Sequence, residues 1–280
     1  MIKLVLSDVD GTLIPLGAGK VDPKTIDAIE HLRATGVRVG LATGRDVQEL
    51  LNMFDGYDGA LQTGILSNGQ KLMVDGEIMR LTLLDISALE RVARIVADYD
   101  ETFMTLYPFK TRPDNPVYCI NADPDHMARC EERYSLTGIP IDHVPHVEAI
   151  GSTIACDLPQ SVLDEIKERA AEACPELDFV QPSEHWCDII PKGLNKGTAL
   201  PELLRELGIT TDEVVVFGDA ENDISILSAV ENSVVVADAM PAAKAAARWQ
   251  IGPCADLAVA QALHEIARVA GTDELPTFMR

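Results

Sequence analysis

Short apolar runs alternate with amphipathic stretches over the first seventy residues. Residues 2–7 form an apolar run that is long enough for a buried strand and too short for a helix, and residues 37–42 form a second such run. Between them the pattern predicts a helix, because Asp22 can cap it, Pro23 suits its first position and Gly36 can end it. The chain therefore begins with the order strand, helix, strand.

The same alternation continues with a helix over 46–54 and a weak strand over 60–64, and it returns from Lys196 onward. The elements predicted in the last part of the chain are helices over 196–207, 242–248 and 257–270 and strands over 214–217 and 234–237. Strands that alternate with helices at this spacing are typical of a parallel sheet with helices on its faces. We therefore expect an α/β protein with a Rossmann-like, doubly wound core.

The middle of the chain has a different pattern. Residues 71–79 alternate around Asp75-Gly76, which indicates a hairpin. The further elements predicted there are helices over 87–97, 125–135 and 161–174, and strands over 102–107, 117–121, 153–157, 179–181 and 186–190, with loops at prolines 108, 113, 116, 140 and 145. We expect residues 1–77 and 192–280 to form the catalytic core, and residues 78–191 to form an inserted α+β cap domain.

Composition narrows the choice of partners. The 280 residues include 45 Asp and Glu but only 23 Lys and Arg, which gives a formal net charge of −22. An acidic surface repels nucleic acid and anionic lipid, so we expect neither as a partner, although a few buried cations can still bind a small anion. No apolar run approaches the roughly 20 residues of a membrane span, and the start lacks the features of a secretory signal. The 6 cysteines are scattered without a Cys-x-x-Cys pair, so we expect reduced thiols in a cytoplasmic protein that is a monomer or weak homodimer.

Two polar clusters follow the first two predicted strands. Asp8 and Asp10 repel each other unless a cation or proton offsets them, and oxygen ligands favour magnesium; a solvated turn is the alternative. In Thr43-Gly44-Arg45 a hydroxyl precedes a helix N-terminus, which suits a phosphate oxygen or, alternatively, an ordinary helix cap.

Two further clusters lie in the last part of the chain. Lys196 begins a predicted helix, where its charge has the wrong sign for the helix dipole, so it indicates an anionic partner. Lys192 is a rival that position alone does not separate from it. Residues 218–223 offer Asp219, Glu221, Asn222 and Asp223 at a strand end; their spacing does not match a calcium-binding loop, and a solvated acidic loop is the alternative.

All four clusters lie at strand carboxyl ends or at the helix starts that face them. A parallel sheet gathers such positions at one edge, where ligands bind in folds of this kind. Together the clusters supply carboxylates, a hydroxyl, a cation and a metal site, which is the chemistry that phosphoryl transfer requires.

These motifs resemble those of the haloacid dehalogenase superfamily. The resemblance rests on Asp8-Val9-Asp10-Gly11-Thr12-Leu13, on Thr43, on Lys196 in Asn195-Lys196-Gly197 and on Gly218-Asp219-Ala220-Glu221-Asn222-Asp223. Ser67-Asn68-Gly69 and Met240-Pro241 further resemble the Cof-type phosphatase branch, and the long insert resembles its type IIB cap.

The resemblance implies a role for each motif residue. It makes Asp8 the nucleophile that becomes an aspartyl phosphate, and Asp10 the general acid and then base. It makes Lys196 the cation that neutralises Asp8 and the phosphate. The phosphoryl oxygens would be held by Thr43, Gly11, Gly44 and Asn222, and a Mg²⁺ cofactor by Asp8, the backbone of Asp10, Asp219 and Asp223, the last through water or by orienting Lys196.

The substrate is expected to contact the insert. Candidates are Tyr107, Lys110, Arg112, His185 and Trp186, together with Arg45 and Asn68 of the core; packing and solvated loops are the alternatives for the insert residues. We expect a magnesium-dependent phosphatase of a small phosphorylated metabolite, a sugar phosphate in the first instance. A phosphomutase-type phosphotransferase and a non-catalytic phospho-ligand-binding protein are the other two hypotheses.

Overall fold

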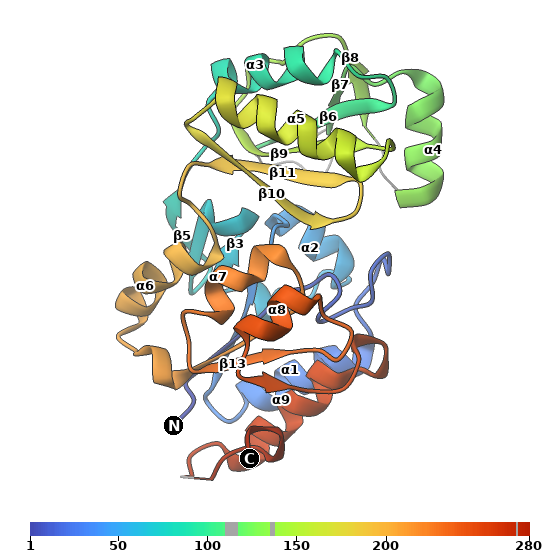
Figure 1. Ribbon diagram of the computed structural model, residues 1–280. Helices are drawn as coiled ribbons and strands as arrows, with labels where there is room; N and C mark the ends of the chain where they lie inside the picture. The colour runs from blue at the N-terminus through green and yellow to red at the C-terminus, as the bar shows by residue number, and fades with distance from the viewer. Residues whose placement is uncertain (110–116, 135–137, 273) are drawn as a thin grey trace. The chain divides into compact units, whose positions relative to one another are not determined.

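Two sheets, each with a buried core of its own, organise the chain (Figure 1). The structure is a computed structural model that describes residues 1–109, 117–134, 138–272 and 274–280. Met1–Leu81 and Asn195–Arg280 form one unit, here called the core unit, and Thr82–Leu194 form a second, here called the insert unit. No helix in the described part of the chain is long and apolar enough to cross a membrane.

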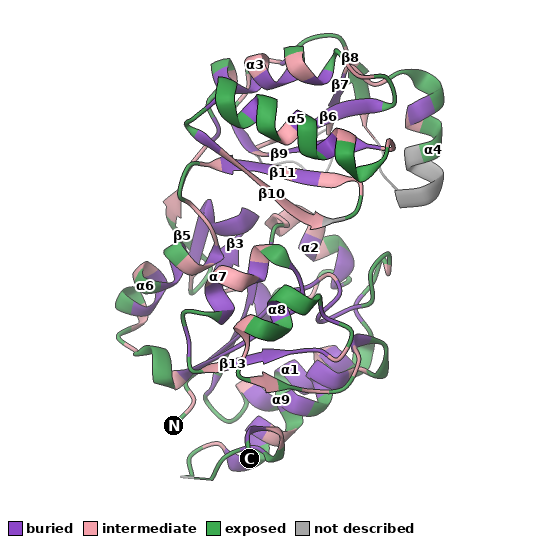
Figure 2. Cartoon of the chain, in the orientation of Figure 1, coloured by how far each residue is buried: buried purple, intermediate pink, exposed green. Residues whose placement is uncertain are grey.

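The core unit is built on an eight-stranded sheet with the strand order β14-β13-β12-β1-β2-β3-β4-β5. Its strands are β1 (Leu4–Ser7), β2 (Arg38–Ala42), β3 (Gly64–Leu66), β4 (Lys71–Val74), β5 (Glu77–Leu81), β12 (Val214–Gly218), β13 (Asn232–Val235) and β14 (Trp249–Gln250). The pairs from β14 to β3 are parallel, and β3, β4 and β5 are antiparallel. Every residue of β1 and β12 is buried, as is typical of a parallel sheet covered on both faces. The labelled strand β3 is also buried throughout, as its purple colour in Figure 2 shows.

Helices connect and cover these strands. They are α1 (Pro23–Arg33), α2 (Val47–Met53), α6 (Lys196–Leu207), α7 (Ile224–Leu227), α8 (Pro241–Ala246) and α9 (Ala258–Val269). Helix α1 packs on α9, whereas α6 packs on α7 and α7 on α8, so the helices form two groups. Two groups of helices on one mostly parallel sheet are the arrangement of a doubly wound α/β fold, which confirms the predicted fold class.

The insert unit has a mostly antiparallel sheet of six strands in the order β10-β11-β9-β6-β7-β8. Its elements are α3 (Ile86–Val96), β6 (Thr102–Pro108), β7 (Tyr118–Ile120), α4 (Pro124–Tyr134), β8 (Ile139–Ile141), β9 (Ala149–Cys156), α5 (Gln160–Ala173), β10 (Leu177–Ser183) and β11 (Trp186–Pro191). Helices α3 and α5 pack on each other, and both contribute to the larger buried cluster of this unit. The predicted α+β character of the insert is therefore what the structure contains.

Three predictions of local structure were wrong. The weak strand expected at 60–64 is a 3₁₀ turn, Gly59–Leu61, and β3 begins only at Gly64. Pro140, taken as a loop residue, lies in β8, and it fits there because β8 is an edge strand on which one N–H is not needed by a neighbour. Pro108, also taken as a loop residue, is the last residue of β6, and the predicted loop residues Pro113 and Pro116 lie outside the described residues. The two units meet a few residues from the predicted bounds: residues 78–81 group with the core unit because β5 pairs with β4, and residues 192–194 group with the insert unit.

Candidate active site

Asp8 occupies the first position after β1. Ser7 of β1 is paired with Phe217 of β12. The pairing of the two chains continues one residue further, because the Asp8 N–H donates to the Phe217 carbonyl oxygen at 2.9 Å. Because β1 and β12 are adjacent and parallel, Asp8 and Asp219 leave the sheet side by side. The Asp8 residue is only 5% exposed, so its carboxylate has little contact with solvent.

Lys196 compensates part of this buried charge. It is the first residue of α6, it is 0% exposed, and its Nζ donates to Asp8 Oδ1 at 2.8 Å and to Asp223 Oδ1 at 2.7 Å. Lys192, its rival in the sequence, lies instead in the insert unit, where its largely exposed side chain pairs with Asp178 at 2.5 Å. The structure therefore separates two lysines that are only four positions apart.

The loop after β12 is held by the side chain of Asp223. Its Oδ2 accepts from the Asp219 N–H at 2.9 Å and from the Ala220 N–H at 3.2 Å, while Oδ1 accepts from Lys196. Thr12 fixes the neighbouring carboxylate, because its hydroxyl donates to Asp219 Oδ1 at 2.6 Å. Both oxygens of Asp223 thus have donors, so this residue orients the loop and Lys196.

Burial of several carboxylates together shifts their ionisation. Burial raises the pKa of Asp8 well above its usual range; Lys196 opposes this rise, and the nearby carboxylates add to it. Burial, followed by the charge of Asp223, raises the pKa of Asp219 to about 7. Burial alone would lower the pKa of Lys196, but the carboxylates of Asp223 and Asp8 outweigh burial and raise it, so the lysine stays charged.

The same carboxylates fit a divalent cation. Ligand oxygens of Asp8, Asp219 and Asp223 all lie within 4.8 Å of one another. When ionised, these three carboxylates exceed the single charge of Lys196 by two (three minus one), so their own repulsion favours a doubly charged ion. A donor set made only of oxygen suits a hard cation such as magnesium.

Asp10 is turned toward a different partner. Arg45 Nε lies 2.5 Å from Asp10 Oδ2 and Nη2 lies 2.8 Å from Oδ1, so the guanidinium holds both carboxylate oxygens. The third nitrogen, Nη1, lies 3.1 Å from Glu49 Oε1 on α2. Both partners of the pair are about one third exposed, unlike Asp8. Arg45, which the sequence assigned to substrate binding, is here engaged with the predicted general acid.

The loops after β2 and β3 bring further predicted residues near one another. Thr43 is buried, and its carbonyl oxygen accepts from the Asn68 N–H at 3.0 Å, whereas Gly44 is exposed. The Asn68 side-chain oxygen in turn accepts from Asn222 Nδ2 at 3.2 Å. This bond links the loop after β3 to the loop after β12, so residues far apart in the sequence share one edge of the core sheet.

Gly11 leaves room for the carboxylate of Asp219. Its φ of +81° lies in the left-handed region, which favours glycine. A Cβ at this position would lie 2.4 Å from Asp219 Oδ2. The Asp-x-Asp-Gly turn therefore needs glycine for two reasons, its backbone conformation and the close approach of Asp219.

The substrate candidates of the insert unit lie at scattered positions. His185 and Trp186 lie at the turn into β11, where Trp186 packs against Phe103 and Ala155, and Tyr107 is half-buried near the end of β6. The candidates Lys110 and Arg112 lie outside the described residues.

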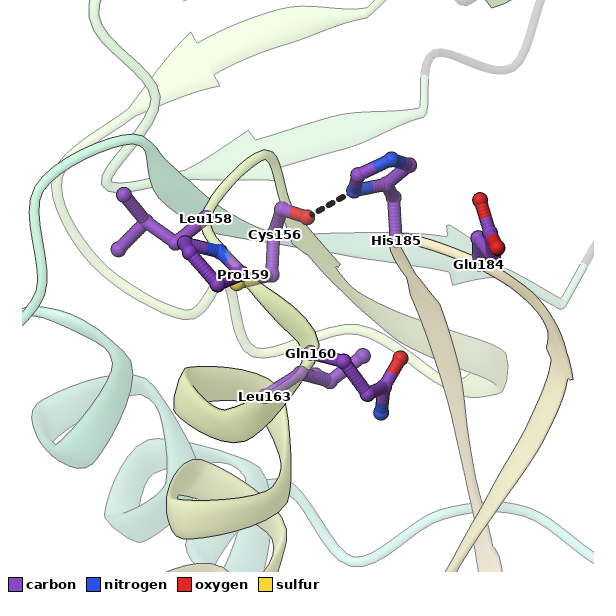
Figure 3. A pocket seen from close by; sticks show the side chains of 7 residues that line it. All are labelled: Cys156, Leu158, Pro159, Gln160, Leu163, Glu184 and His185. Carbon is purple, nitrogen blue, oxygen red and sulfur yellow. Dashed lines mark hydrogen bonds between the residues drawn. The ribbon is translucent and has the colours of Figure 1, made fainter.

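A cavity of about 260 Å³ opens in the same unit (Figure 3). His185 lines it together with Cys156, Leu158, Pro159, Gln160, Leu163 and Glu184. Figure 3 shows His185 Nδ1 directed at the Cys156 carbonyl oxygen, 2.8 Å away. The cavity contains none of the residues of the core motifs, so it is separate from the carboxylate cluster.

Three interactions of the site were not foreseen. The Thr12 hydroxyl donates to Asp219, although only Asp8, Asp10 and Gly11 of the motif that contains Thr12 were given roles. Glu49 on α2 pairs with Arg45, which lies four residues earlier, just before the N-cap residue Asp46; this spacing could have been noticed. Lys71 is buried on β4 and pairs with Asp46. A lysine at an inward position of the predicted hairpin could have indicated such a buried ion pair.

Comparison with known proteins gives the same assignment over most of the chain. The sequence profile of the haloacid dehalogenase-like hydrolases matches residues 5–263. The HMP-PP phosphatase of Yersinia pseudotuberculosis serotype O:1b (strain IP 31758) is 28% identical over 271 residues, which cover 94% of this chain and 95% of the relative. The HMP-PP phosphatase of Yersinia pestis (strain Pestoides F) is 29% identical over the same length and coverage.

Solved structures share the fold. SMU.1108c from Streptococcus mutans UA159 superposes with a TM-score of 0.81 at 19% identity, covering 94% of this chain and 98% of that one. The HAD subclass IIB sugar phosphatase BT4131 superposes with a TM-score of 0.76 at 22% identity and the same coverage. At these identities the likeness shows a common architecture of core and insert.

Proposed function

The chain belongs to the haloacid dehalogenase-like hydrolase family as a Cof-type phosphatase, and we propose that it hydrolyses a small phosphorylated metabolite through an aspartyl phosphate on Asp8. A sugar phosphate is the first substrate class to test, and HMP-PP, named for the relatives, is the second. The proposed reaction requires Mg²⁺.

The observation that carries this proposal is the ion pair between Asp8 and Lys196. Asp8, a residue that is only 5% exposed, has a charged lysine 2.8 Å from its carboxylate, at a strand end where parallel sheets bind ligands. A purely structural pair needs no second and third carboxylate beside it. Asp219 and Asp223 add charge that favours a cation, and a cation together with Lys196 suits a phosphoryl group.

The proposed reaction has two steps. A carboxylate oxygen of Asp8 attacks phosphorus and the bond to the substrate oxygen breaks, while Asp10 gives that oxygen its proton. Water then attacks the phosphorus of the aspartyl phosphate, Asp10 takes a proton from the water, and the bond to Asp8 breaks to release phosphate. Because both Asp10 oxygens accept from Arg45, at least one must be released before Asp10 can carry the proton.

The carboxylates of Asp8 and Asp219, with the backbone of Asp10, are the proposed magnesium ligands. The ion, when bound, supplies positive charge next to the transferring phosphoryl group. Thr12 holds Asp219, and Asp223 holds Lys196 and the loop, so these two residues position the ligands and the cation. Thr43, Gly44 and Asn222 are the proposed contacts for the phosphoryl oxygens.

The insert unit is proposed to select the substrate. The residues of the phosphoryl chemistry all lie in the core unit, which leaves the insert to contact the alcohol part of the substrate. Binding energy from a remote part of a substrate can position the reacting group. We place the selection in residues such as Tyr107, His185 and Trp186.

The test is a phosphate-release screen of phosphorylated metabolites, including sugar phosphates and HMP-PP, with Mg²⁺ and with chelator. The proposal expects release that depends on Mg²⁺, a phosphoenzyme that can be trapped on wild type, and neither signal from Asp8→Asn. Full activity in excess chelator, after removal of the metal, would falsify the metal requirement. Transfer of the phosphoryl group to an added sugar in preference to water would instead identify a phosphotransferase.

A further inference from the structure

Three potential metal ligands meet at one end of the insert sheet, apart from the residues described above. Glu101 precedes β6 and Asp157 follows β9, and these strands are antiparallel neighbours with Thr102 opposite Cys156. The Asp157 N–H donates to the Glu101 carbonyl oxygen at 3.1 Å, which keeps the two residues side by side. His126 reaches them from the first turn of α4.

The imidazole of His126 is buried without a hydrogen bond at one of its nitrogens. The residue is 1% exposed, and its ring packs edge-on against Phe103 at a centroid distance of 4.9 Å. Nε2 has no hydrogen-bond partner among the described residues, although Asp157 Oδ2 lies 3.2 Å away. A buried polar nitrogen costs free energy unless something binds it, so the cluster calls for a ligand at Nε2.

The distances fit a shared metal ion. Ligand atoms of Glu101, His126 and Asp157 all lie within 4.8 Å of one another. Nitrogen and oxygen ligands about 2.0–2.2 Å from one ion, at angles between about 90° and 110°, lie roughly 2.8–3.6 Å apart. The 3.2 Å between Nε2 and Asp157 Oδ2 falls in that interval without forming a hydrogen bond.

We propose that Glu101, His126 and Asp157 bind a divalent transition-metal ion of the Zn²⁺ type in the insert unit. One imidazole and two carboxylates suit zinc, whereas magnesium prefers oxygen ligands alone, as in the core carboxylate cluster. Three protein ligands leave a fourth position for water. The ion would tie α4 to the ends of β6 and β9.

Ion pairs without a metal are the competing explanation. Arg129 pairs with Glu101 Oε2, and the 3.2 Å contact of His126 with Asp157 would be an ion pair if the imidazole were protonated. A carboxylate has two oxygens, so Arg129 and a metal ion can share Glu101. The two explanations differ in one measurable respect, since only the metal site predicts stoichiometric binding of zinc.

The experiment uses the full chain after removal of metals, in excess Mg²⁺ to fill the core site. Titration with Zn²⁺, with bound metal counted by mass spectrometry, is expected to give one equivalent. Co²⁺ in place of Zn²⁺ is expected to show visible d–d bands, which report an ordered site. Glu101→Gln, which changes an exposed side chain, and Asp157→Asn should each weaken binding by at least about 10- to 100-fold, since even residues behind a metal ligand cost that much. The matched control is His143→Gln, a histidine of the same unit with a 72% exposed side chain, and it should bind like wild type.

A second readout separates this site from the core. Zn²⁺ should raise the thermal unfolding temperature of wild type and of Asp219→Asn, but not that of the Asp219→Asn, Glu101→Gln double variant. Absence of a zinc equivalent in wild type, or equal binding in Glu101→Gln, Asp157→Asn and wild type, overturns the proposal. Because phosphatase activity is not measured, neither result depends on the proposed function.

Discussion

Asp10 and Arg45 form a two-pronged ion pair, with Nε 2.5 Å from Oδ2 and Nη2 2.8 Å from Oδ1. A planar guanidinium that meets both oxygens of a carboxylate fixes its orientation as well as its charge. The pair therefore sets where the proposed acid lies before substrate arrives. Glu49 on α2 accepts a hydrogen bond from the same guanidinium. The first turn of that helix therefore helps to fix Arg45 and, through it, Asp10.

Arg45→Ala distinguishes positioning of Asp10 from binding of substrate. If Arg45 positions the acid, kcat should fall while KM stays near its wild-type value, and the loss should not exceed the ~10²–10⁴ of losing the acid itself. Arg45→Lys should recover little, because an ammonium cannot meet both oxygens. The control is Arg38→Ala, an exposed arginine that pairs with Asp75 on the core surface. A rise in KM at constant kcat would restore the substrate-binding role.

Asp8→Asn and Asp10→Asn should fail in different ways. The first should abolish turnover and the phosphoenzyme together, because an amide is a poor nucleophile. The second should leave substrate binding largely intact and reduce kcat on the order of 10²–10⁴, the usual contribution of a positioned acid or base. Steady-state rates and trapping of labelled phosphoenzyme test both; wild-type turnover by Asp10→Asn would remove Asp10 from the mechanism.

Removal of the buried lysine should destabilise the core unit. Lys196→Ala leaves Asp8 and Asp223 without their shared cation, and breaking a buried ion pair on one side costs about 3–5 kcal/mol. Urea unfolding of the metal-free protein measures this loss. Lys192→Ala is the matched control, since that side chain is 63% exposed and its surface pair contributes about 0–1 kcal/mol. A similar loss of unfolding free energy in both variants would contradict the prediction that the buried ion pair contributes more than the exposed one.

Magnesium affinity should depend on pH through Asp219. Burial raises the pKa of this carboxyl to about 7, so below that pH the metal-free site holds a proton that the ion must displace. Displacement of this proton should make the affinity fall at least about tenfold for each pH unit below 7, and a proton on Asp8, whose pKa burial also raises, would make the fall steeper. Calorimetry in buffers of different ionisation enthalpy would measure the released proton. Constant affinity between about pH 5.5 and 8 would show that Asp219 is already ionised.

Gly11→Ala should damage metal binding more than it damages the fold. The new methyl would lie 2.4 Å from Asp219 Oδ2, so the carboxylate must move, and a left-handed backbone adds about 1–3 kcal/mol of strain. Gly17→Ala separates the two effects, because its φ of +79° is similar and nothing lies within 4 Å of its Cβ. Magnesium titration and activity should be impaired only in Gly11→Ala, whereas thermal unfolding should shift in both.

The elements of the core followed from local pattern. Apolar runs such as β1 and β12 and the capping residue of α1 could be predicted because burial and capping act over a few neighbouring residues. The topological rule for parallel sheets then predicted that the motif residues share one edge. Whether each takes its predicted part in catalysis stays a prediction.

Other features required the tertiary structure. Lys192 and Lys196 are close in sequence, but Lys196 is buried as the first residue of α6, whereas Lys192 precedes that helix and is largely exposed. Pro140 could be placed in a strand only once β8 was known to be an edge. Arg45 could be paired with Asp10 only once β1 and β2 lay side by side. These features depend on contacts between segments that are distant in the sequence. The local sequence pattern around each residue therefore could not predict them.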